Sequence, residues 1–487
     1  MEHAIAVFDV GKTNKKLLLF SDDLKPVHVE SIRIGEVRRD DILCDDAERL
    51  EGWLRERLRD ASRKYRIKGV NVSTYGATLA YMSRGSRIFP IISYNQDIEP
   101  EVRREFYERF GSPLELYKIT GTPPYGRLIV AGLQIYWFRR RFPEIFGKVD
   151  RILFLPQYLL YWLSGLEAGE VTSIGCHTYL YDLRSMDWSV VARDLEVDKR
   201  SPDLVNVWDE VGTFDLDGSR VVAAPGIHDS NASILPFALE GRDALVASTG
   251  TWCVFMYPRA EFDPKPGDLD RDVVYYVNPY KKPVRSSRFA GGYEHDHYVK
   301  LIENRFGVDP RGMGLDPEIL SEIISGRRDF VAPGLIEKTG QFQRSKPRII
   351  GDGFEKSAKY AYHVLILSLA IQSRIAIDLI SEGRRPEIIV LGGFANNEIY
   401  LQMLSALLQE NRVFKSMFPE TTGLGAAICC KCAVEGARPE DVRAKPPLME
   451  VPKPEIDLDK LEKYVSAFVE VCSEGRAEEK DISAGSQ

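Results

Sequence analysis

The sequence predicts an α/β fold with two or three domains, and three observations support this. Short apolar segments with strand character alternate with longer segments in which apolar residues recur at helical spacing. At 487 residues the chain is long enough for two or three domains of about 150 residues each. A hydrophobic fraction of 44% and a charged fraction of 28% lie near globular averages, which excludes wholesale disorder and collagen.

The composition also limits the classes of binding partner and the cellular compartment that we expect. The net charge of −7 argues against a general nucleic-acid binder. The sequence has no run of about 18 apolar residues, so we expect no membrane partner. Residues 1–10 include Glu2 and Asp9 and do not have the pattern of a signal peptide. We therefore expect a cytoplasmic protein, and leave open whether it is a monomer or a homodimer.

Three of the seven cysteines are close together in the sequence. Cys429, Cys430 and Cys432 fall in residues 425–434, where small residues predict a helix. Adjacent helical residues point about 100° apart, so these thiols are badly placed to share one ion. We expect buried small hydrophobic side chains instead.

The elements of the first half are expected in the following order. Residues 4–20 form a hairpin, with strands at 5–8 and 16–20 around a polar turn at 9–14. The other expected elements are a helix at 48–66, a strand at 69–74, helices at 128–142 and 156–163, and a strand at 221–224 that leads to Asp229.

The second half repeats part of this pattern. A second hairpin covers residues 243–257, with a polar turn at 247–251, about 240 residues after the first. This repetition suggests two related domains. The remaining expected elements are a helix at 357–380, a strand at 387–391, a helix at 397–408, a helix from residue 422, and a charged, proline-rich tail after residue 435.

Three turns have residues that suit a nucleotide. The turn at 9–16 offers Gly11, hydroxyl and amide side chains and lysines, which can cradle phosphate, and Asp9 could hold Mg²⁺ through water. The turn at 248–251 offers two threonine hydroxyls around Gly250. The segment 391–397 has two glycines and two asparagines between a strand and a helix, which suits adenine or ribose. Each could also be an ordinary turn.

Asp229 follows His228 at the end of a predicted strand. An Asp in this position could act as a general base toward a sugar hydroxyl. The alternative is a helix N-cap before residues 230–235.

Taken together and in this order, these motifs resemble the FGGY carbohydrate kinases over roughly residues 4–440. The resemblance implies two ribonuclease-H-like domains of the actin, Hsp70 and sugar-kinase superfamily, with an active-site cleft between them. It implies an N-terminal domain at 1–236, a C-terminal domain at 237–440 and an extension at 441–487. The implied activity is transfer of the γ-phosphate of ATP to a sugar, with Mg²⁺ as cofactor.

The resemblance also assigns roles to residues. Asp229 would be the base, and Asp9 and Asp229 would hold Mg²⁺. Nucleotide contacts would come from Thr13, Asn14, Lys15 or Lys16, Thr249, Gly250, Thr251, Gly392, Gly393, Asn396 and Asn397. Sugar contacts would come from Tyr75, Gly76, Gln96, Asp97 and His228.

The segments around His228-Asp229, 120–123 and 155–165 are similar to rhamnulokinases and fuculokinases. They suggest a ketose phosphorylated on a terminal hydroxyl, with a 6-deoxy-ketose such as L-rhamnulose or L-fuculose as first choice. Alternatives are another ketopentose or polyol, such as ribulose or xylulose, or a sugar sensor without catalysis. An ATP-driven protein of the superfamily that is not a kinase is a further alternative.

Residues 291–297, with sequence GGYEHDH, match no motif that we can assign. We expect a surface loop or a loop of the sugar cleft. A metal hydrolase built on His228, Asp229, His295 and His297 is the remaining alternative, although an i,i+2 histidine pair suits two ligands only on a strand.

Overall fold

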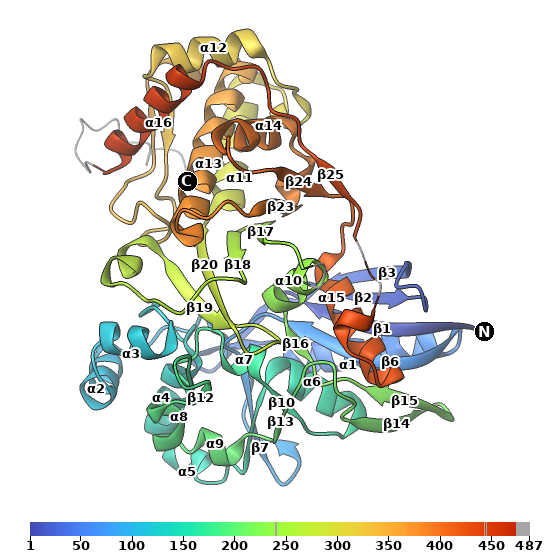
Figure 1. The fold of residues 1–487 in the computed structure, drawn as a ribbon. Helices are drawn as coiled ribbons and strands as arrows, with labels where there is room; N and C mark the ends of the chain where they lie inside the picture. Colours follow the sequence, from blue (N-terminus) through green and yellow to red (C-terminus); the bar gives the residue numbers. More distant parts are fainter. Residues whose placement is uncertain (239–240, 443, 445, 474–487) are drawn as a thin grey trace.

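The structure is a computed structural model that describes residues 1–238, 241–442, 444 and 446–473. Two seven-stranded sheets dominate it, one in each half of the molecule in Figure 1. The first contains β1 (Glu2–Val10), β2 (Asn14–Phe20), β3 (Pro26–Arg33), β6 (Tyr65–Thr74), β14 (Gly212–Leu216), β15 (Ser219–Ala223) and β16 (Ile227–His228). The second contains β17 (Ala244–Thr249), β18 (Cys253–Tyr257), β19 (Val273–Val277), β20 (Pro283–Phe289), β23 (Glu387–Gly392), β24 (Val413–Ser416) and β25 (Leu448–Glu450).

The two sheets share one strand pattern. In the first, β1, β2 and β3 are antiparallel neighbours and β6 is parallel to β1. In the second, β17, β18 and β20 are antiparallel neighbours and β23 is parallel to β17. The α/β class and the relation between the two predicted hairpins are therefore confirmed. The turns β1–β2 and β17–β18 occupy equivalent places.

Helices pack around the large sheets and around the smaller ones. They are α1 (Ala47–Ser62), α2 (Pro100–Phe110), α3 (Pro113–Thr120), α4 (Ala131–Arg141), α5 (Pro143–Phe146), α6 (Leu155–Ser164), α7 (Val171–Ile174), α8 (Val190–Asp194), α9 (Val197–Arg200), α10 (Asp229–Ala238), α11 (Gly291–Phe306), α12 (Pro317–Gly326), α13 (Ala358–Ser381), α14 (Glu398–Leu407), α15 (Thr421–Glu435) and α16 (Leu458–Ser473). The predicted helix 48–66 ends earlier, because Tyr65 already pairs with Glu2 in the first sheet.

Short strands form smaller sheets beside the main ones. These strands are β4 (Glu36–Arg39), β5 (Ile42–Asp45), β7 (Leu79–Ser83), β8 (Ser86–Arg87), β9 (Arg151–Phe154), β10 (Gly169–Glu170), β11 (Tyr181–Asp182), β12 (Asp187–Trp188), β13 (Leu204–Val205), β21 (Phe330–Ala332) and β22 (Arg348–Ile350).

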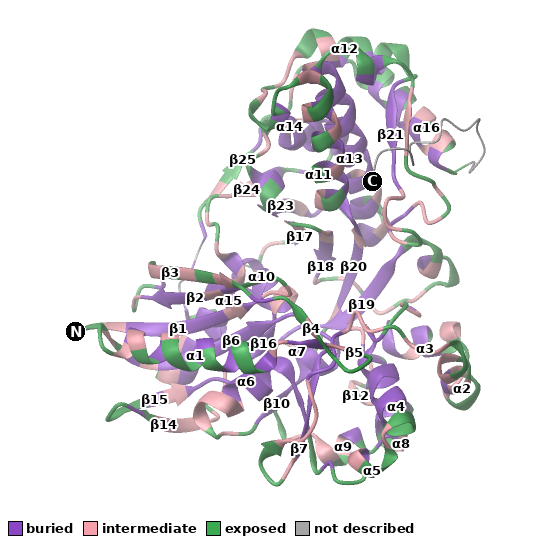
Figure 2. Cartoon of the chain, turned by 180° about the vertical axis from the view of Figure 1, so that it is seen from behind, coloured by how far each residue is buried: buried purple, intermediate pink, exposed green. Residues whose placement is uncertain are grey.

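Helix α13 is the central helix of the second domain, and Figure 2 shows it coloured as buried along most of its length. By length and composition it could cross a membrane, with a mean hydropathy of 1.8 over an 18-residue window. However, 78% of that window is buried inside the protein. The helix therefore has the character of a core helix, packed against α11, α14 and β18.

The C-terminal part of the chain returns to both domains. Helix α15 packs against α10, β6 and β1 of the first domain, and its three cysteines are buried and free, as predicted. Gly425 is required there, because a Cβ atom would lie 1.8 Å from the Ala232 carbonyl oxygen. Strand β25 joins the second sheet, and α16 packs against α12 and β21. Residues 448–473 of the tail thus pack on the second domain, and the boundaries at 236 and 440 stay predictions.

Candidate active site

The register of the first hairpin separates the two candidate lysines. Asp9 pairs with Lys16, and Val10 pairs with Lys15. Because neighbouring strand residues face opposite sides of a sheet, Lys16 lies beside Asp9 and Lys15 points the other way. The Lys15 ammonium donates to the carbonyl oxygens of Lys12 (2.6 Å) and Ile34 (2.8 Å) and is buried. Lys15 therefore stabilises the turn, and Lys16 lies on the same face of the sheet as Asp9.

Lys16 and the two other predicted residues of this turn are accessible. The Lys16 ammonium is 2.8 Å from the Glu420 carboxylate, and about a third of its side chain is exposed. Thr13 and Asn14 are exposed at the tip of the turn. These three side chains are therefore placed where a phosphate could reach them.

Asp9 and Asp229 are brought together from β1 and α10. Burial, followed by the charge of Asp229, raises the pKa of Asp9 to about 7, while the charge of Lys16 opposes this shift. Burial also raises the pKa of Asp229 to about 6. Two carboxylates that disfavour each other's charge are suited to share a divalent cation, whose preferred ligands are oxygen atoms. The donor set thus fits Mg²⁺.

Asp229 is placed by a strand-to-helix junction. Ile227 and His228 form the short strand β16, which pairs in parallel with Ser73 and Thr74 of β6. Helix α10 begins at the next residue, Asp229. The Asp229 Oδ1 accepts a hydrogen bond from the Ser230 backbone N–H at 2.6 Å. The predicted N-terminal helix position is therefore real, but a third of the side chain stays exposed. One oxygen anchors the carboxylate at the helix start, and the group can still meet a substrate.

His228 supports this carboxylate. Its Nε2 lies 3.3 Å from the Asp229 Oδ1. The Asn231 side-chain nitrogen donates to the Val277 carbonyl oxygen (3.1 Å) and approaches the His228 Nδ1 at 3.4 Å. Since an amide nitrogen can only donate, the His228 Nδ1 accepts and its Nε2 carries the proton. Burial lowers the pKa of His228 to about 4, so the ring is neutral, and its Nε2–H donates to the Cys176 Sγ at 3.5 Å beside the Asp229 carboxylate.

Gly76, His177 and His228 form a close-packed wall beside Asp229. At Gly76 a Cβ atom would lie 3.1 Å from the His177 Nε2 and 3.3 Å from the His228 Nε2. Tyr75, the preceding residue, donates from its hydroxyl to the Asp45 carboxylate at 2.8 Å. His177 was not predicted from the sequence, since no motif marks it. Burial, followed by the nearby His228, lowers its pKa to about 3, so this ring is neutral as well.

Two predicted sugar ligands have other roles in the structure. The Gln96 side-chain oxygen accepts a hydrogen bond from the Leu43 backbone N–H at 2.7 Å, and its nitrogen donates to the Asp97 carbonyl oxygen. The Asp97 side chain is 86% exposed and pairs with Arg127 at 3.3 Å. None of these contacts of Gln96 and Asp97 involves His228.

Two cations that were not predicted lie near this wall, and each is paired. The Lys12 ammonium contacts the carboxylates of Asp45 (2.5 Å) and Glu36 (3.0 Å). It also lies 4.4 Å from the centre of the Tyr94 ring. Arg288 of β20 pairs with Asp272 at 3.3 Å.

Arg288 joins the two domains at this place. Its guanidinium carbon is 4.4 Å from the Tyr125 ring centre and 4.8 Å from the Trp252 ring centre. Tyr125 belongs to the first domain, while Trp252 follows the second candidate phosphate turn. The end of β20 in the second sheet therefore lies against the first domain near His177 and His228.

One group of three metal-ligating side chains occurs in the described part of the chain. The ligand atoms of Cys176, His177 and His228 lie within 4.8 Å of one another. His177 donates from Nδ1 to the Ile129 carbonyl oxygen, which leaves its Nε2 free to bind. The His228 Nε2, however, carries a proton because Asn231 faces Nδ1, so this group is a poor metal site. It also differs from the set His228, Asp229, His295 and His297 that the sequence suggested.

The second and third candidate turns line one cavity of about 430 Å³. From the predicted set it is lined by Thr249, Gly250, Thr251, Gly393, Asn396 and Asn397. Gly392 lies directly behind: its φ is +82°, and a Cβ atom there would be 2.2 Å from the Thr249 carbonyl oxygen. Thr249 joins the two turns, since its hydroxyl donates to the Leu391 carbonyl oxygen and accepts from the Phe394 N–H.

The same cavity explains residues 291–297. The expected loop is wrong: these residues form the first turns of α11. Gly292 packs on the second turn so closely that a Cβ atom would lie 2.1 Å from the Gly250 carbonyl oxygen. His295 then lines the cavity, with its ring 5.3 Å from that of Phe394 and its Nε2 3.2 Å from the Tyr362 hydroxyl.

Other residues of this cavity had no sequence signal. Asp296, Arg311 and Tyr362 also line it, and Asn397 donates to the Tyr362 hydroxyl at 2.8 Å. A flat aromatic wall with amide and hydroxyl groups suits a purine. The guanidinium of Arg311 is paired with Glu303 and Asp309.

The paired sheets and this site belong to the actin, Hsp70 and sugar-kinase class of two-domain proteins. Family models for the N-terminal domain of the FGGY family of carbohydrate kinases and for the C-terminal domain of carbohydrate kinase FGGY match residues 4–201 and 241–439. The chain belongs to the FGGY family of carbohydrate kinases and is a phosphotransferase that acts on a small-molecule sugar.

Individual relatives are distant. The xylulose kinase of Lactococcus lactis is 22% identical over 74% of this chain and 73% of its own length. The rhamnulokinase of Halalkalibacterium halodurans is 22% identical over 52% of this chain and 55% of its own. Among solved structures, a carbohydrate kinase from Novosphingobium aromaticivorans has a TM-score of 0.80 and 25% identity, covering 96% of this chain and 98% of that one. These relatives do not agree on one sugar.

Proposed function

We propose that this sugar kinase transfers the γ-phosphate of Mg-ATP to a terminal hydroxyl of a neutral ketose, with Asp229 as the base. One observation carries the proposal. Asp229 stands at the end of the first sheet between Asp9, which suits a metal ion, and the wall of Gly76, His177 and His228, which suits a sugar. A hydroxyl held at that wall would meet a base and a metal ion together.

Each residue has a separate task in this proposal. Asp229 accepts the proton of the attacking hydroxyl, and the neutral ring of His228 packs beside the carboxylate, with its Nε2 at 3.3 Å. Asp9 and Asp229 would hold Mg²⁺, which neutralises phosphate charge when it is bound. Because phosphoryl transfer depends mainly on positioning and charge stabilisation, the base supplies only part of the rate.

The nucleotide would bind in the cavity of the second domain. Thr249, Gly250 and Thr251 would contact its phosphates, and Gly392, Gly393, Asn396 and Asn397 its adenosine part. His295, Tyr362 and Phe394 supply the flat wall for adenine. Thr13, Asn14 and Lys16 would approach the β- and γ-phosphates from the first domain.

The charges near the sugar wall support a neutral acceptor. Lys12 pairs with two carboxylates and Arg288 with one. Burial keeps both histidines neutral. Within the described residues of this wall, no cation is left to receive a sugar carboxylate, and burying an unpaired carboxylate would be costly.

Among neutral ketoses, a 6-deoxy-ketose such as L-rhamnulose or L-fuculose is our first choice. The His228-Asp229 pair, which resembles the rhamnulokinase and fuculokinase segment, supports it. A ketopentose is the second candidate, because the xylulose kinase relative matches 74% of the chain.

ADP release from Mg-ATP tests the proposal across L-rhamnulose, L-fuculose, D- and L-xylulose, D- and L-ribulose, glycerol and gluconate. We expect one ketose to dominate and gluconate to be inert. Asp229→Asn should lower its turnover by about 10²–10⁴-fold. Asp97→Asn is a matched control, since that side chain is 86% exposed, and should stay near the wild-type rate. A gluconate rate above every ketose would refute the neutral acceptor, and an active Asp229→Asn variant would refute the base.

A further inference from the structure

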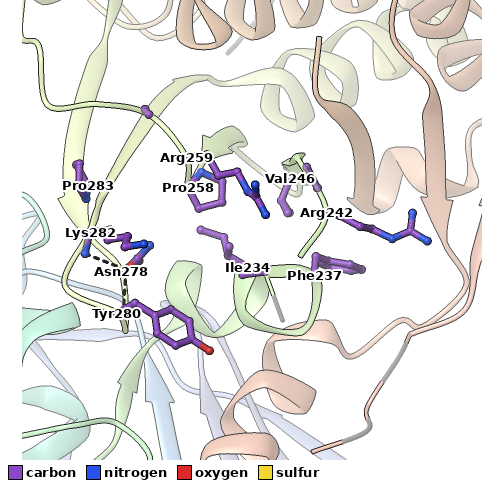
Figure 3. A pocket seen from close by; sticks show the side chains of 13 residues that line it. Ile234, Phe237, Arg242, Val246, Pro258, Arg259, Asn278, Tyr280, Lys282 and Pro283 are labelled. Carbon is purple, nitrogen blue, oxygen red and sulfur yellow. Dashed lines mark hydrogen bonds between the residues drawn. The ribbon is translucent and has the colours of Figure 1, made fainter. Parts of the chain in front are cut away.

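A second cavity, of about 440 Å³, lies apart from the site above, where the two domains meet. Figure 3 shows it between α10, the start of β17, the segment after β18 and the turn between β19 and β20. Residues of the proposed sugar and nucleotide sites do not line it. It is therefore a separate place, and its size falls within the range of pockets for small ligands.

The side chains around this cavity are basic. Arg242, Arg259 and Lys282 line it, whereas no aspartate or glutamate of the described chain does so. Arg242 pairs with Glu387 at 2.8 Å, and in Figure 3 its side chain leads away from the other cations. Arg259 and Lys282 reach toward the space from different segments in the same view. The Arg259 Nη2 donates to the Gly241 carbonyl oxygen at 2.6 Å, so a ligand would meet the other N–H groups of Arg259 and the Lys282 ammonium.

The turn that carries Lys282 is well defined. The Asn278 side-chain oxygen accepts hydrogen bonds from the backbone N–H groups of Tyr280 (2.9 Å) and Lys282 (3.0 Å). Asn278 itself is 6% exposed. The lysine therefore projects from a fixed turn, and only its side chain has to order when a ligand binds.

The floor of the cavity is apolar. Ile234, Phe237 and Val246 are buried and belong to the core cluster between α10 and the second sheet. A bare inorganic ion would leave this floor uncovered. An organic ligand with a doubly charged end would satisfy both parts, and a phosphate ester carries close to two charges at neutral pH, whereas a carboxylate carries one.

We propose that this cavity binds a small organic phosphate as a regulatory ligand. Helix α10 connects it to the active site, because Asp229 is the first residue of that helix and Phe237 lines the cavity near its end. Strand β17 makes a second connection, from Val246 to Thr249 of the phosphate turn. A ligand that touches both domains favours the domain arrangement it fits best, and so changes turnover.

Calorimetric titration of the full chain tests this proposal, with saturating Mg-ADP present to occupy the nucleotide turns. The probes are glucose 6-phosphate, glucose and inorganic phosphate. We expect glucose 6-phosphate to bind with one site per chain and the other two to bind at least about tenfold more weakly, a loss of about 1.4 kcal/mol. Binding should weaken as salt is raised, since the anchors are charged and partly exposed.

Matched variants locate the binding. Arg259→Gln with Lys282→Gln should weaken glucose 6-phosphate by about tenfold or more, because charged hydrogen bonds to phosphate are lost. Lys281→Gln removes an exposed neighbouring charge that does not line the cavity, and should stay within about twofold. All variants are first checked by circular dichroism and thermal melting.

The other outcomes each overturn the proposal. No binding of glucose 6-phosphate to the wild-type chain rejects the site. If the double variant binds glucose 6-phosphate as tightly as the wild-type chain, the binding site lies elsewhere. If inorganic phosphate binds as tightly as glucose 6-phosphate, the cavity is a simple anion site. Since binding is measured without turnover, the result does not depend on the proposed acceptor or base.

Discussion

The turns β1–β2 and β17–β18 occupy the same place in two similar sheets, yet their residues differ in charge. The first is charged: Asp9 is the second-last residue of β1, and Lys16 stands opposite it. The second is neutral: Thr249 ends its strand and Cys253 stands opposite. In the proposed function, the first turn would place charge near the reacting phosphate, and the second would fit its backbone around the nucleotide.

The way in which each turn is supported follows from this difference. Around the first, charges balance one another, as Lys16 meets Glu420 and Lys12 meets Asp45. Around the second, glycines allow close packing, because both Gly292 and Gly392 touch residues 249–250. A change of charge should therefore damage the first turn most, and a change of volume the second.

The largest effect is expected from Asp9→Asn. The substitution keeps shape but removes a charge that faces Asp229, so Mg²⁺ loses one of two carboxylates. We expect kcat to fall by about 10²–10⁴-fold, consistent with several kcal/mol of lost charge stabilisation. Steady-state ADP release at increasing Mg²⁺ measures this. Thr249→Ser, which keeps the hydroxyl, is the control in the other turn. Unchanged kcat at every Mg²⁺ concentration would remove Asp9 from the metal site.

Volume is tested by Gly292→Ala against Gly11→Ala. The new Cβ atom would lie 2.1 Å from the Gly250 carbonyl oxygen in the first case and 3.0 Å from the Asn14 carbonyl oxygen in the second. We expect Gly292→Ala to lower the free energy of unfolding by about 1–3 kcal/mol and to raise the KM for ATP.

Gly11→Ala should have the smaller effect on both quantities, which urea unfolding and ATP titration of initial rates can compare. If the two substitutions raised the KM for ATP equally, the tight packing of the second turn would not be its distinguishing property.

The first turn also contains its own internal comparison, between adjacent lysines. Lys16→Gln should lower kcat by about tenfold with a change in unfolding free energy below about 1 kcal/mol, since its ion pair is partly exposed. Lys15→Gln should mainly destabilise the protein, by about 1–3 kcal/mol, as two carbonyl oxygens lose a charged donor.

Parallel kinetics and unfolding curves separate the two effects. A reversed result, with Lys15→Gln catalytically impaired and fully stable, would show that the register of β1 and β2 does not decide which lysine acts.

The sequence predicted best what depends on local order. Both hairpins, the strand before Asp229 and the helix with three cysteines follow from residue pattern and turn chemistry. The order of the weak motifs then led to the family. The position of Asp229 could be inferred because a strand end and a helix start are both visible in residues 226–235.

The features that the sequence did not predict depend on contacts between residues far apart in the chain. His177 and Arg288 reach the site from separate segments, and no local pattern marks them. Gln96 stays a predicted sugar contact, and its side-chain oxygen also accepts a hydrogen bond from the distant Leu43 backbone N–H. Residues 291–297 matched no motif, so a loop was expected. The structure begins α11 at Gly291, and Gly292 packs closely against the distant Gly250.

The smallest effect concerns pH and Lys15 alone. Burial lowers the pKa of Lys15 from 10.5 to about 8. Below pH 8 the folded and unfolded chains both hold this proton. Between about pH 8 and 10.5 the unfolded chain holds it while the folded chain has released it, so this residue makes stability rise with pH.

Lys15→Met removes this contribution. Relative to that variant, the wild-type chain should gain about 1–2 kcal/mol of unfolding free energy between about pH 7 and 9.5. Urea unfolding at both pH values measures the difference, with the exposed Lys25→Met as control. A gain of the same size relative to Lys25→Met would mean that the pH dependence belongs to other groups. No gain at all would mean that the Lys12 and Ile34 carbonyl oxygens keep the buried ammonium charged, and the first turn would then be held by charge on both of its faces.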